Sequence, residues 1–322
     1  MMVSRPCAFC AALIISVMMG QAERATVAGT NGASAEAAAP VVQLVPNDTE
    51  YTTLTNVTGN GEYDFGFQVG EELYYKIYWG WIPVGKSRII TRWVEKDGKR
   101  FIAIRFRTRS NSVIRKIYKV DDRFESIIDP ETFLPVKFSK KLHQGKQRYH
   151  QATTFDHENK VAHWTSFKKN VEKDLDIESD TRDILTSLYY MRSMKIKEGD
   201  HNAFTVMEGE KLYELEVQAH KVERVRTKGF GKVKALKLVP KAKFNGLFVQ
   251  KGEMTTWGST DERFVAVRIE GQIPVAKVKI ILSEVYGPSD DFWTNTTKEN
   301  SKSKAKKEVD EEDVEAALRE LD

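Results

Sequence analysis

Apolar and polar residues alternate along this chain from Phe65 to Tyr286, and this pattern limits the folds that the chain can adopt. In "KRFIAIRFRTRS", for example, Ile102, Ile104 and Phe106 alternate with three arginines. Successive side chains of a strand point to opposite faces, so a period of two indicates strands that bury one face. We therefore expect this part of the chain to be mainly β.

Turn-forming pairs interrupt the alternation at short intervals, as expected for strands joined by hairpins. A large number of consecutive antiparallel strands normally curls, because each strand twists relative to its neighbour. The sequence therefore predicts a large curved antiparallel sheet that closes into a barrel or half-barrel. The predicted turns include Asp97-Gly98, Gly145, Glu158-Asn159, Glu208-Gly209 and Asn245-Gly246.

One segment, "SDTRDILTSLYYMRSMKIKEGD", has helical spacing instead. Its apolar residues Ile184, Leu188 and Met191 recur every three or four positions, which predicts an amphipathic helix packed on the sheet. Asp180 precedes this run and Asp183 follows three residues later, so we expect Asp180 to be the N-cap.

The remaining segments divide the chain into four parts. Residues 1–22 combine an early Arg5 with a short apolar run and small residues before the expected cleavage site, as in a secretory signal peptide. Cleavage after Ala22 removes Cys7 and Cys10, the only cysteines, and excludes disulfides and thiolate sites. We expect a flexible leader at 23–61, a single β-rich domain at 62–287, and a charged, largely disordered tail at 288–322.

The chain also resembles an exported bacterial family, domain of unknown function 3108. The matching segments, spread over about Phe65 to Leu282, are "FQVGEELYYKIYWGWIPVGKS", "DPETFLPVKF", "FDHENKVAHW", the helical segment, and "TTWGSTDERFVAVRIEGQIPVAKVKIIL". The resemblance implies an exported, β-rich domain of the periplasm or cell envelope. It implies no catalytic residues, because the family has no established activity.

An aromatic run near the start, "GEELYYKIYWGWIPVGKS", supplies the candidate ligand-binding residues. Rings on both faces of one strand favour either a core strand ending at a sheet corner or an aromatic wall facing a lipid or glycan. Together with the helix, the second interpretation gives the candidates Tyr74, Tyr78, Trp79, Trp81, Leu188 and Tyr189.

The arginine face of "IRFRTRS" is the candidate anion-binding site. Arg105, Arg107 and Arg109 share one strand face, and the chain has a formal net charge of +4. A solvated strand face is the alternative interpretation, and an anionic headgroup or envelope polymer is the ligand that such a face would bind.

No motif indicates catalysis, a metal or a cofactor. Four histidines, His143, His150, His157 and His163, lie in one stretch but lack the spacing of a metal site, and we expect exposed strand histidines. The sequence contains neither a GxSxG nucleophile motif nor a phosphate-binding loop. We therefore expect no cofactor and no metal, and the sequence does not indicate an enzyme.

Three interpretations of function follow. The leading one is a noncatalytic periplasmic or envelope domain that binds a lipid or other amphiphile in a barrel-like groove. The second is an envelope structural or adaptor protein with a solidly packed barrel, and the third, weaker one is a polysaccharide-active enzyme, which needs convergent carboxylates. The expected partners are a lipid or an anionic polymer, with no nucleic acid and no transmembrane segment after signal cleavage.

Overall fold

The computed structural model of the chain describes residues 50–54, 59–244, 247–248, 254–273 and 276–288. These residues form a 16-stranded antiparallel sheet and two helices. The helices are α2 (Ser112–Ile117) and α3 (Ile184–Ser193). The strands are β1 (Thr52–Thr53), β2 (Glu72–Trp79), β3 (Ile82–Lys96), β4 (Lys99–Ser110), β5 (Asp121–Ile128), β6 (Pro135–Gln144), β7 (Gln147–Asp156), β8 (Val161–Ser166), β9 (Val171–Asp176), β10 (His201–Glu208), β11 (Lys211–Arg226), β12 (Lys232–Phe244), β13 (Leu247–Phe248), β14 (Met254–Ser259), β15 (Ala266–Ile273) and β16 (Ala276–Tyr286).

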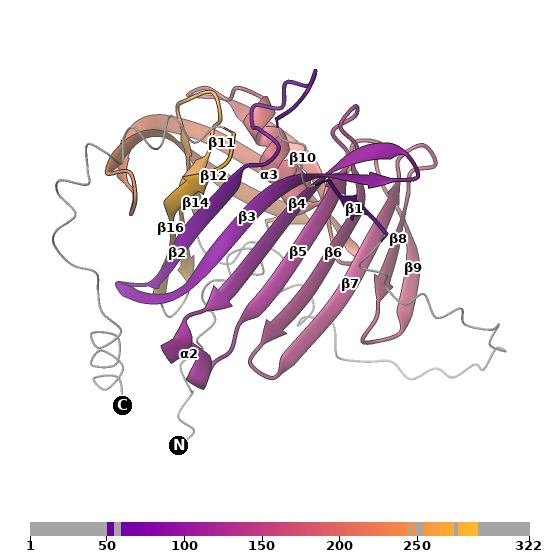
Figure 1. Cartoon of the computed structure of the whole chain (residues 1–322), viewed down its shortest axis with the longest axis horizontal. Helices are drawn as coiled ribbons and strands as arrows, with labels where there is room; N and C mark the ends of the chain where they lie inside the picture. The colour runs from indigo at the N-terminus through magenta and orange to yellow at the C-terminus, as the bar shows by residue number, and fades with distance from the viewer. Residues whose placement is uncertain (1–49, 55–58, 245–246, 249–253, 274–275, 289–322) are drawn as a thin grey trace.

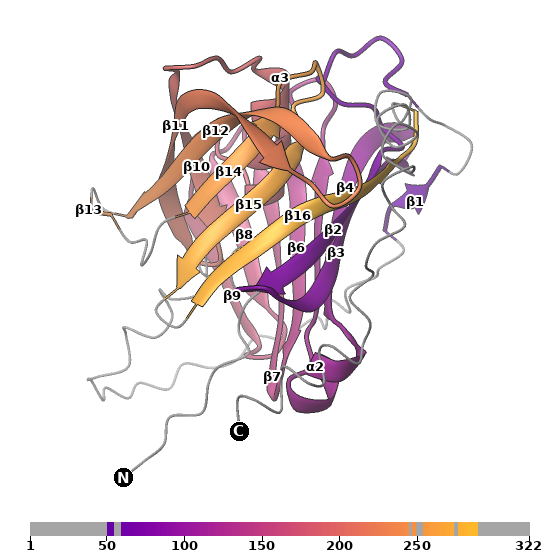
Figure 2. The same cartoon turned by 90° about the vertical axis from the view of Figure 1, so that its left-hand side faces the viewer.

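The sheet is a meander that curls on itself, as Figures 1 and 2 show. Its strand order is β10-β11-β12-β14-β15-β16-β2-β3-β4-β5-β6-β7-β8-β9, with β1 beside β3 and β13 beside β12. Most neighbours are consecutive in sequence; β16 returns to pair with β2. The end strands β9 and β10 are not paired with each other, so the described sheet is curled and open. This confirms the predicted mainly β, half-barrel fold.

Hairpin turns occupy the predicted positions. Asp97 and Gly98, with φ angles of 52° and 75°, join β3 to β4, as in the two-residue turns that Asp-Gly pairs favour. Gly145 and Gly209 also have positive φ, at the β6–β7 and β10–β11 turns. The predicted turn at 245–246 lies outside the described residues.

The aromatic run forms the β2–β3 hairpin. Gly80 and Trp81 make its turn. The strand register shifts between Ile77, which pairs with Gly85, and Tyr78, which pairs with Pro83. Gly85 is required here by close packing, because a Cβ would lie 2.5 Å from the carbonyl oxygen of Arg109. The abrupt end of the aromatic strand is therefore a bulged hairpin. Leu73, Tyr75 and Ile77 are buried, as expected for one face of a strand.

The predicted helix exists as α3, but its predicted cap is wrong. Asp183 is the N-cap, and one of its carboxylate oxygens, Oδ1, accepts from the backbone N–H groups of Leu185 and Thr186 at 2.8 and 3.0 Å. Asp180 is exposed and lies three residues before this cap. Residues 180–182 form a turn and an isolated bridge from Arg182 to Val206, so the helix begins later than expected. The spacing of the apolar residues does not reveal this bridge and therefore did not distinguish the two aspartates.

The sheet and α3 enclose the larger of two main apolar clusters. That cluster joins rings from the chain before β2 with α3 and residues of several strands from β3 to β12, including Phe67, Trp93, Phe124, Tyr189 and Phe204. The second cluster gathers around β2, β15 and β16 and also holds Ile114 of α2. α2 itself was not predicted, because six residues are too few to show a helical period.

The predicted signal peptide, most of the leader and the tail from 289 onward lie outside the described residues, so their predicted organisation stays a prediction. In the portion of the chain that the structure describes, neither helix has the length and apolar character needed to cross a bilayer.

Candidate functional site

A cavity of about 1040 Å³ lies beside the C-terminal end of α3. Apolar side chains from four different parts of the chain contribute to its lining: Phe67 from the segment before β2, Ile196 from beyond α3, Leu236 from β12, and Phe264 from the β14–β15 loop. The size suits a small organic ligand or part of a lipid. The curl of the sheet brings these segments together.

Charged residues line the same cavity. The basic residues of the lining are Arg192, Lys195, Lys197 and Arg263, and its acidic residues are Asp64, Glu198, Asp261 and Glu262. The two lysines are exposed, whereas Arg263 is half-buried and its Nε lies 3.4 Å from a carboxylate oxygen of Asp261. The cavity therefore combines apolar lining residues with a rim that carries charges of both signs.

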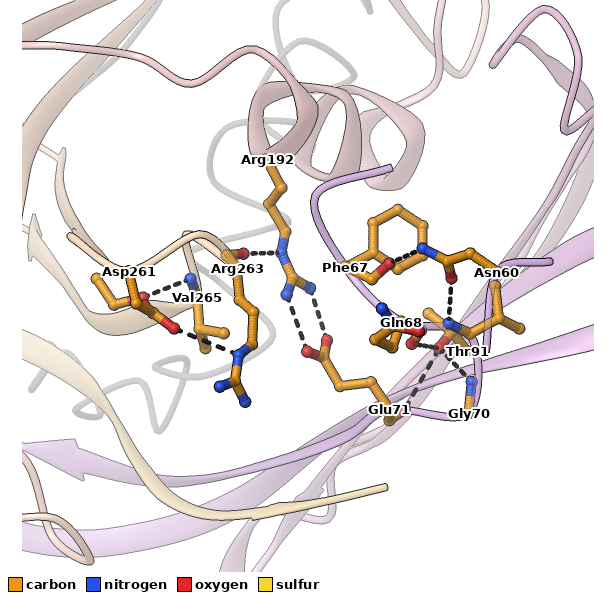
Figure 3. A network of polar contacts seen from close by, with 12 residues as sticks. Asn60, Phe67, Gln68, Gly70, Glu71, Thr91, Arg192, Asp261, Arg263 and Val265 are labelled. Atoms are coloured by element: carbon orange, nitrogen blue, oxygen red, sulfur yellow. Dashed lines mark hydrogen bonds and ion pairs between the residues drawn. The ribbon is translucent and has the colours of Figure 1, made fainter. Parts of the chain in front are cut away.

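Arg192, in the last turn of α3, forms hydrogen bonds to two other segments beside the cavity (Figure 3). Its two terminal nitrogens donate to the two carboxylate oxygens of Glu71 at 2.6 and 2.9 Å. Its Nε donates to the backbone oxygen of Arg263 at 2.7 Å, and its guanidinium carbon lies 5.4 Å from the centre of the Phe67 ring. One side chain thus joins the helix to β14–β15 and to the segment before β2.

Burial and charge act in opposite directions on this arginine. Burial alone lowers the pKa of Arg192, but the facing carboxylate of Glu71 outweighs burial and holds the pKa above its usual value. Burial raises the pKa of the neighbouring Tyr75 and Tyr189 hydroxyls. Arg192 therefore stays cationic and the tyrosines stay neutral at any physiological pH.

The wall that carries Phe67 is held by side-chain to backbone hydrogen bonds (Figure 3). The Asn60 amide donates to the Phe67 oxygen at 2.5 Å and accepts from the Val69 nitrogen at 2.9 Å. Thr91 of β3 accepts from the Gly70 nitrogen at 3.1 Å. Because each end of the wall segment is bonded, the wall is fixed relative to β3.

This arrangement is suited to binding. An apolar surface can cover a hydrocarbon chain, and basic groups at its edge can pair with an anionic head. In the described residues no three His, Cys, Asp or Glu side chains gather as they would around a metal ion.

The structure does not bring the six candidate aromatic and helical residues together. Tyr74 and Tyr78 share the partly exposed face of β2, with the Tyr74 hydroxyl donating to Glu72 at 2.8 Å. Trp79 packs against the smaller cluster, and Trp81 is 68% exposed at the hairpin turn. None of these four lines the cavity described above.

The two helical candidates pack into the larger cluster. Leu188 is partly buried there, and Tyr189 is buried with its ring 4.7 Å from that of Phe67, edge to face. Tyr189 therefore packs against the Phe67 ring, which contributes to the cavity lining, whereas Leu188 packs against the larger apolar cluster.

The three candidate arginines lie side by side on β4, and each has an acidic neighbour. Arg105 donates to Glu125 at 2.5 Å, and Arg107 binds Asp121 through two hydrogen bonds of 2.9 Å each. Arg109 lies 3.4 Å from Asp121 and is half-exposed.

The four histidines of β6 to β8 do not converge. His157 bonds to the Pro135 oxygen at 2.8 Å, and His163 pairs with Asp174 at 2.6 Å. His143 and His150 line a separate cleft of about 350 Å³.

Sequence reasoning missed Glu71 and Arg192, although a signal for the second exists. Arg192 falls three residues after Tyr189 and four after Leu188, on the apolar stripe of the predicted helix. A charge on a buried stripe implies a buried partner. Nothing in the sequence identifies Glu71 as that partner, because Glu72 adjoins it and 121 positions separate Glu71 from Arg192.

Comparisons with known proteins found solved structures of low sequence identity and one protein family. A β-barrel-like protein of the domain of unknown function DUF1849 from Brucella abortus is 10% identical, with a TM-score of 0.47, covering 69% of this chain and 98% of that one. A protein with a YmcC-like fold from Bacteroides fragilis is 10% identical, with a TM-score of 0.30, covering 69% of this chain and 97% of that one. No curated protein matches the chain. The profile of DUF3108, described as a protein of unknown function, matches residues 74–283, and the chain therefore belongs to the DUF3108 family.

Proposed function

We propose that this protein is a noncatalytic amphiphile-binding protein of the bacterial cell envelope. The observation that carries the proposal is the cavity of about 1040 Å³, in which Val222 and Phe264 offer accessible apolar surface near the exposed Lys195 and Lys197. A fatty acid or a similar single-chain amphiphile has the matching chemistry: a hydrocarbon chain for the apolar lining and an anionic head for Lys195 and Lys197.

Export rests on the N-terminal sequence. The early arginine, the short uncharged apolar run and the small residues Gly20 and Ala22 are typical of a signal peptide. We expect the exported protein to begin at Glu23 without an acyl chain. Intact-mass measurement of protein from the envelope tests this; a retained leader or an added lipid contradicts it.

Ligand binding can be tested by filling the cavity with a side chain. Val222 lines the cavity and is 41% exposed, so Val222→Trp adds volume without overpacking a core. We expect this variant to bind a fluorescent fatty acid at least about tenfold more weakly than the unchanged protein, since each 1.4 kcal/mol of lost contact is tenfold in affinity. Thr154→Trp, at an exposed position of β7 outside the cavity lining, is the matched control and should bind normally.

The charged rim gives a second, independent readout. Lys195→Glu with Lys197→Glu reverses exposed charges at the cavity without touching its apolar wall. The double variant should weaken binding of the fatty acid but not of its uncharged methyl ester. Equal effects on both ligands would contradict pairing between the rim and an anionic head.

A structural or adaptor role is the second candidate, and the packed interior favours it. Leu188 and Tyr189 lie against the larger apolar cluster, so the sheet under α3 is filled by side chains. If the folded protein binds no fatty acid, and co-purifies with no lipid in native mass spectrometry, the carrier proposal fails and this alternative stands.

A further inference from the structure

Basic side chains form two rows across the outer face of the sheet, and we name this region the basic face. In one row, Arg88 of β3 lies opposite Arg107 of β4, which lies opposite Arg123 of β5 and then Lys141 of β6. Residues directly opposite in antiparallel strands share a face. The second row, one pleat away, joins Lys76, Lys86 and Arg109.

Only part of this charge is neutralised. Asp121 faces three guanidinium groups at once: it binds Arg107 through two bonds of 2.9 Å and lies 3.4 Å from Arg109 and 3.7 Å from Arg123. Burial alone raises the pKa of Asp121, but Arg107 and Arg109 lower it to about 2. One carboxylate cannot balance three cations, and cations directly opposite each other destabilise a sheet. The basic face therefore keeps an excess of positive charge.

Toward α3, acidic partners accompany the arginines of the same face. In the next row toward α3, Arg105 lies opposite Glu125 and donates to it. Glu72 of the same row pairs with Arg92, which lies one pleat further along β3. At the edge of the basic face, a cleft of about 350 Å³ is lined by further basic residues, including Arg148 and Lys168. A cleft of this size beside cationic side chains suits a phosphate-bearing headgroup.

Two exposed apolar residues border the basic face at the same end. Trp81, at the β2–β3 turn, is 68% exposed, and Ile117, at the end of α2, is 71% exposed. Asn111 fixes the start of α2 beside this hairpin, because its side chain donates to the Pro83 oxygen at 2.6 Å and its backbone nitrogen donates to the Val84 oxygen at 3.0 Å. Figures 1 and 2 show α2 and the hairpin at the end of the sheet opposite α3.

We propose that this end of the protein docks on an anionic bilayer surface. Trp81 and Ile117 enter the interfacial region of the membrane, where tryptophan is favoured, while the basic face contacts anionic headgroups. The exposed helix residues Arg115 and Lys116 extend the positive charge next to Ile117. A soluble anionic polymer would use the charge but gain little from the two apolar residues, so the combination favours a bilayer.

This inference is independent of the proposed ligand cavity, which lies at the other end of the sheet. Its test is sedimentation of the purified protein with vesicles of phosphatidylglycerol and phosphatidylcholine, against vesicles of phosphatidylcholine alone. We expect binding to the anionic vesicles only, and release as the salt concentration rises, because surface charges are screened.

Three variants separate the contributions of the basic face, of net charge and of the two exposed apolar residues to vesicle binding. Lys86→Glu with Arg88→Glu reverses two exposed charges of the basic face and should weaken vesicle binding at least about tenfold, since each basic residue near an anionic surface contributes about fivefold. Lys221→Glu with Lys234→Glu makes the same change in net charge at exposed positions of β11 and β12 and should have little effect. Trp81→Ala with Ile117→Ala should weaken binding severalfold without loss of folding.

Each contrary result overturns the proposal. If the unchanged protein does not sediment with anionic vesicles, the membrane-docking proposal is wrong. Equal weakening by the two charge-reversed variants shows that net charge, not the basic face, governs binding. If the Trp81 and Ile117 variant binds as well as the unchanged protein, and polyglutamate competes fully with vesicles, the surface is a polyanion site and the bilayer assignment is wrong.

Discussion

Arg192 and Glu71 form a buried, doubly hydrogen-bonded ion pair, with nitrogen to oxygen distances of 2.6 and 2.9 Å, between residues 121 positions apart. Both side chains are almost inaccessible to solvent, at 7% and 1% exposure. Because the same guanidinium also binds the Arg263 backbone, the pair fixes the position of three cavity walls relative to one another.

Breaking this pair is expected to be costly. Arg192→Met leaves the Glu71 carboxylate buried without a partner, and we expect the free energy of unfolding to fall by about 3 to 5 kcal/mol at pH 7. The double variant Arg192→Met with Glu71→Gln should lose less than the sum of the two single variants, since neither charge then remains alone. Urea unfolding of the four proteins measures the coupling; additive losses would show that the two groups do not depend on each other.

The cavity wall before β2 depends on a glycine. Gly66 has a φ of +66°, and a Cβ there would lie 2.4 Å from the backbone oxygen of Arg192. Gly80 has a similar φ of +60° but nothing within 4 Å of its Cβ position, so it is a matched control. We expect Gly80→Ala to cost only backbone strain, about 1 to 2 kcal/mol, and Gly66→Ala to cost clearly more. Equal losses in thermal denaturation would contradict the close contact.

The N-cap of α3 can be assigned by two single variants. Asp183 is fully buried and, besides its two backbone bonds, accepts from the Ser126 and Thr186 hydroxyls at 2.6 and 2.7 Å. Asp183→Ala should lower the free energy of unfolding by at least about 2 kcal/mol, because it removes the cap and leaves buried donors unpaired. Asp180→Ala, at an exposed position, should change it by less than about 0.5 kcal/mol. Chemical denaturation of the two variants decides between the two aspartates.

A pH effect is expected from Asp122 of β5. Burial raises its pKa to about 6, and hydrogen bonds from Gln144 and the His143 backbone offset only part of this. A carboxyl with a raised folded pKa stabilises the fold at low pH, and this contribution is lost as the pH rises from about 4 through 6.

The variant Asp122→Asn removes that titration. Relative to the variant, the unchanged protein should therefore lose about 2 to 3 kcal/mol of stability between pH 4 and pH 7. Urea unfolding at several pH values measures the difference, with the exposed Asp180→Asn as control. A difference that does not vary with pH would show that Asp122 titrates normally.

Leu188 distinguishes a packed interior from an open one. Because it packs against the larger apolar cluster, Leu188→Trp should overpack that cluster and lower the free energy of unfolding by about 1 to 3 kcal/mol. It should leave fatty-acid binding at the cavity unchanged, since Leu188 does not line it. Loss of binding with unchanged stability would mean that the ligand lies under α3 instead.

The fold class could be predicted from the sequence, because strand periodicity and hairpin turns are local features. Alternation placed Leu73, Tyr75 and Ile77 on a buried face, and Asp97-Gly98 fixed a two-residue turn. Helical spacing likewise located α3, since it depends only on neighbours three and four positions apart. The half-barrel could be predicted because a long meander of twisted strands has few other ways to bury one face.

Which of these residues meet depends on contacts between distant segments, and the sequence does not show those contacts. The cavity joins segments from the chain before β2, the end of α3, β12 and the β14–β15 loop, and no local period records such distant contacts. The Arg192 and Glu71 pair, and the basic rows that cross from β3 to β6, depend on strand register and on the curl of the sheet. A one-residue change of register would reverse every face, so the site follows from the assembled sheet and not from any one strand.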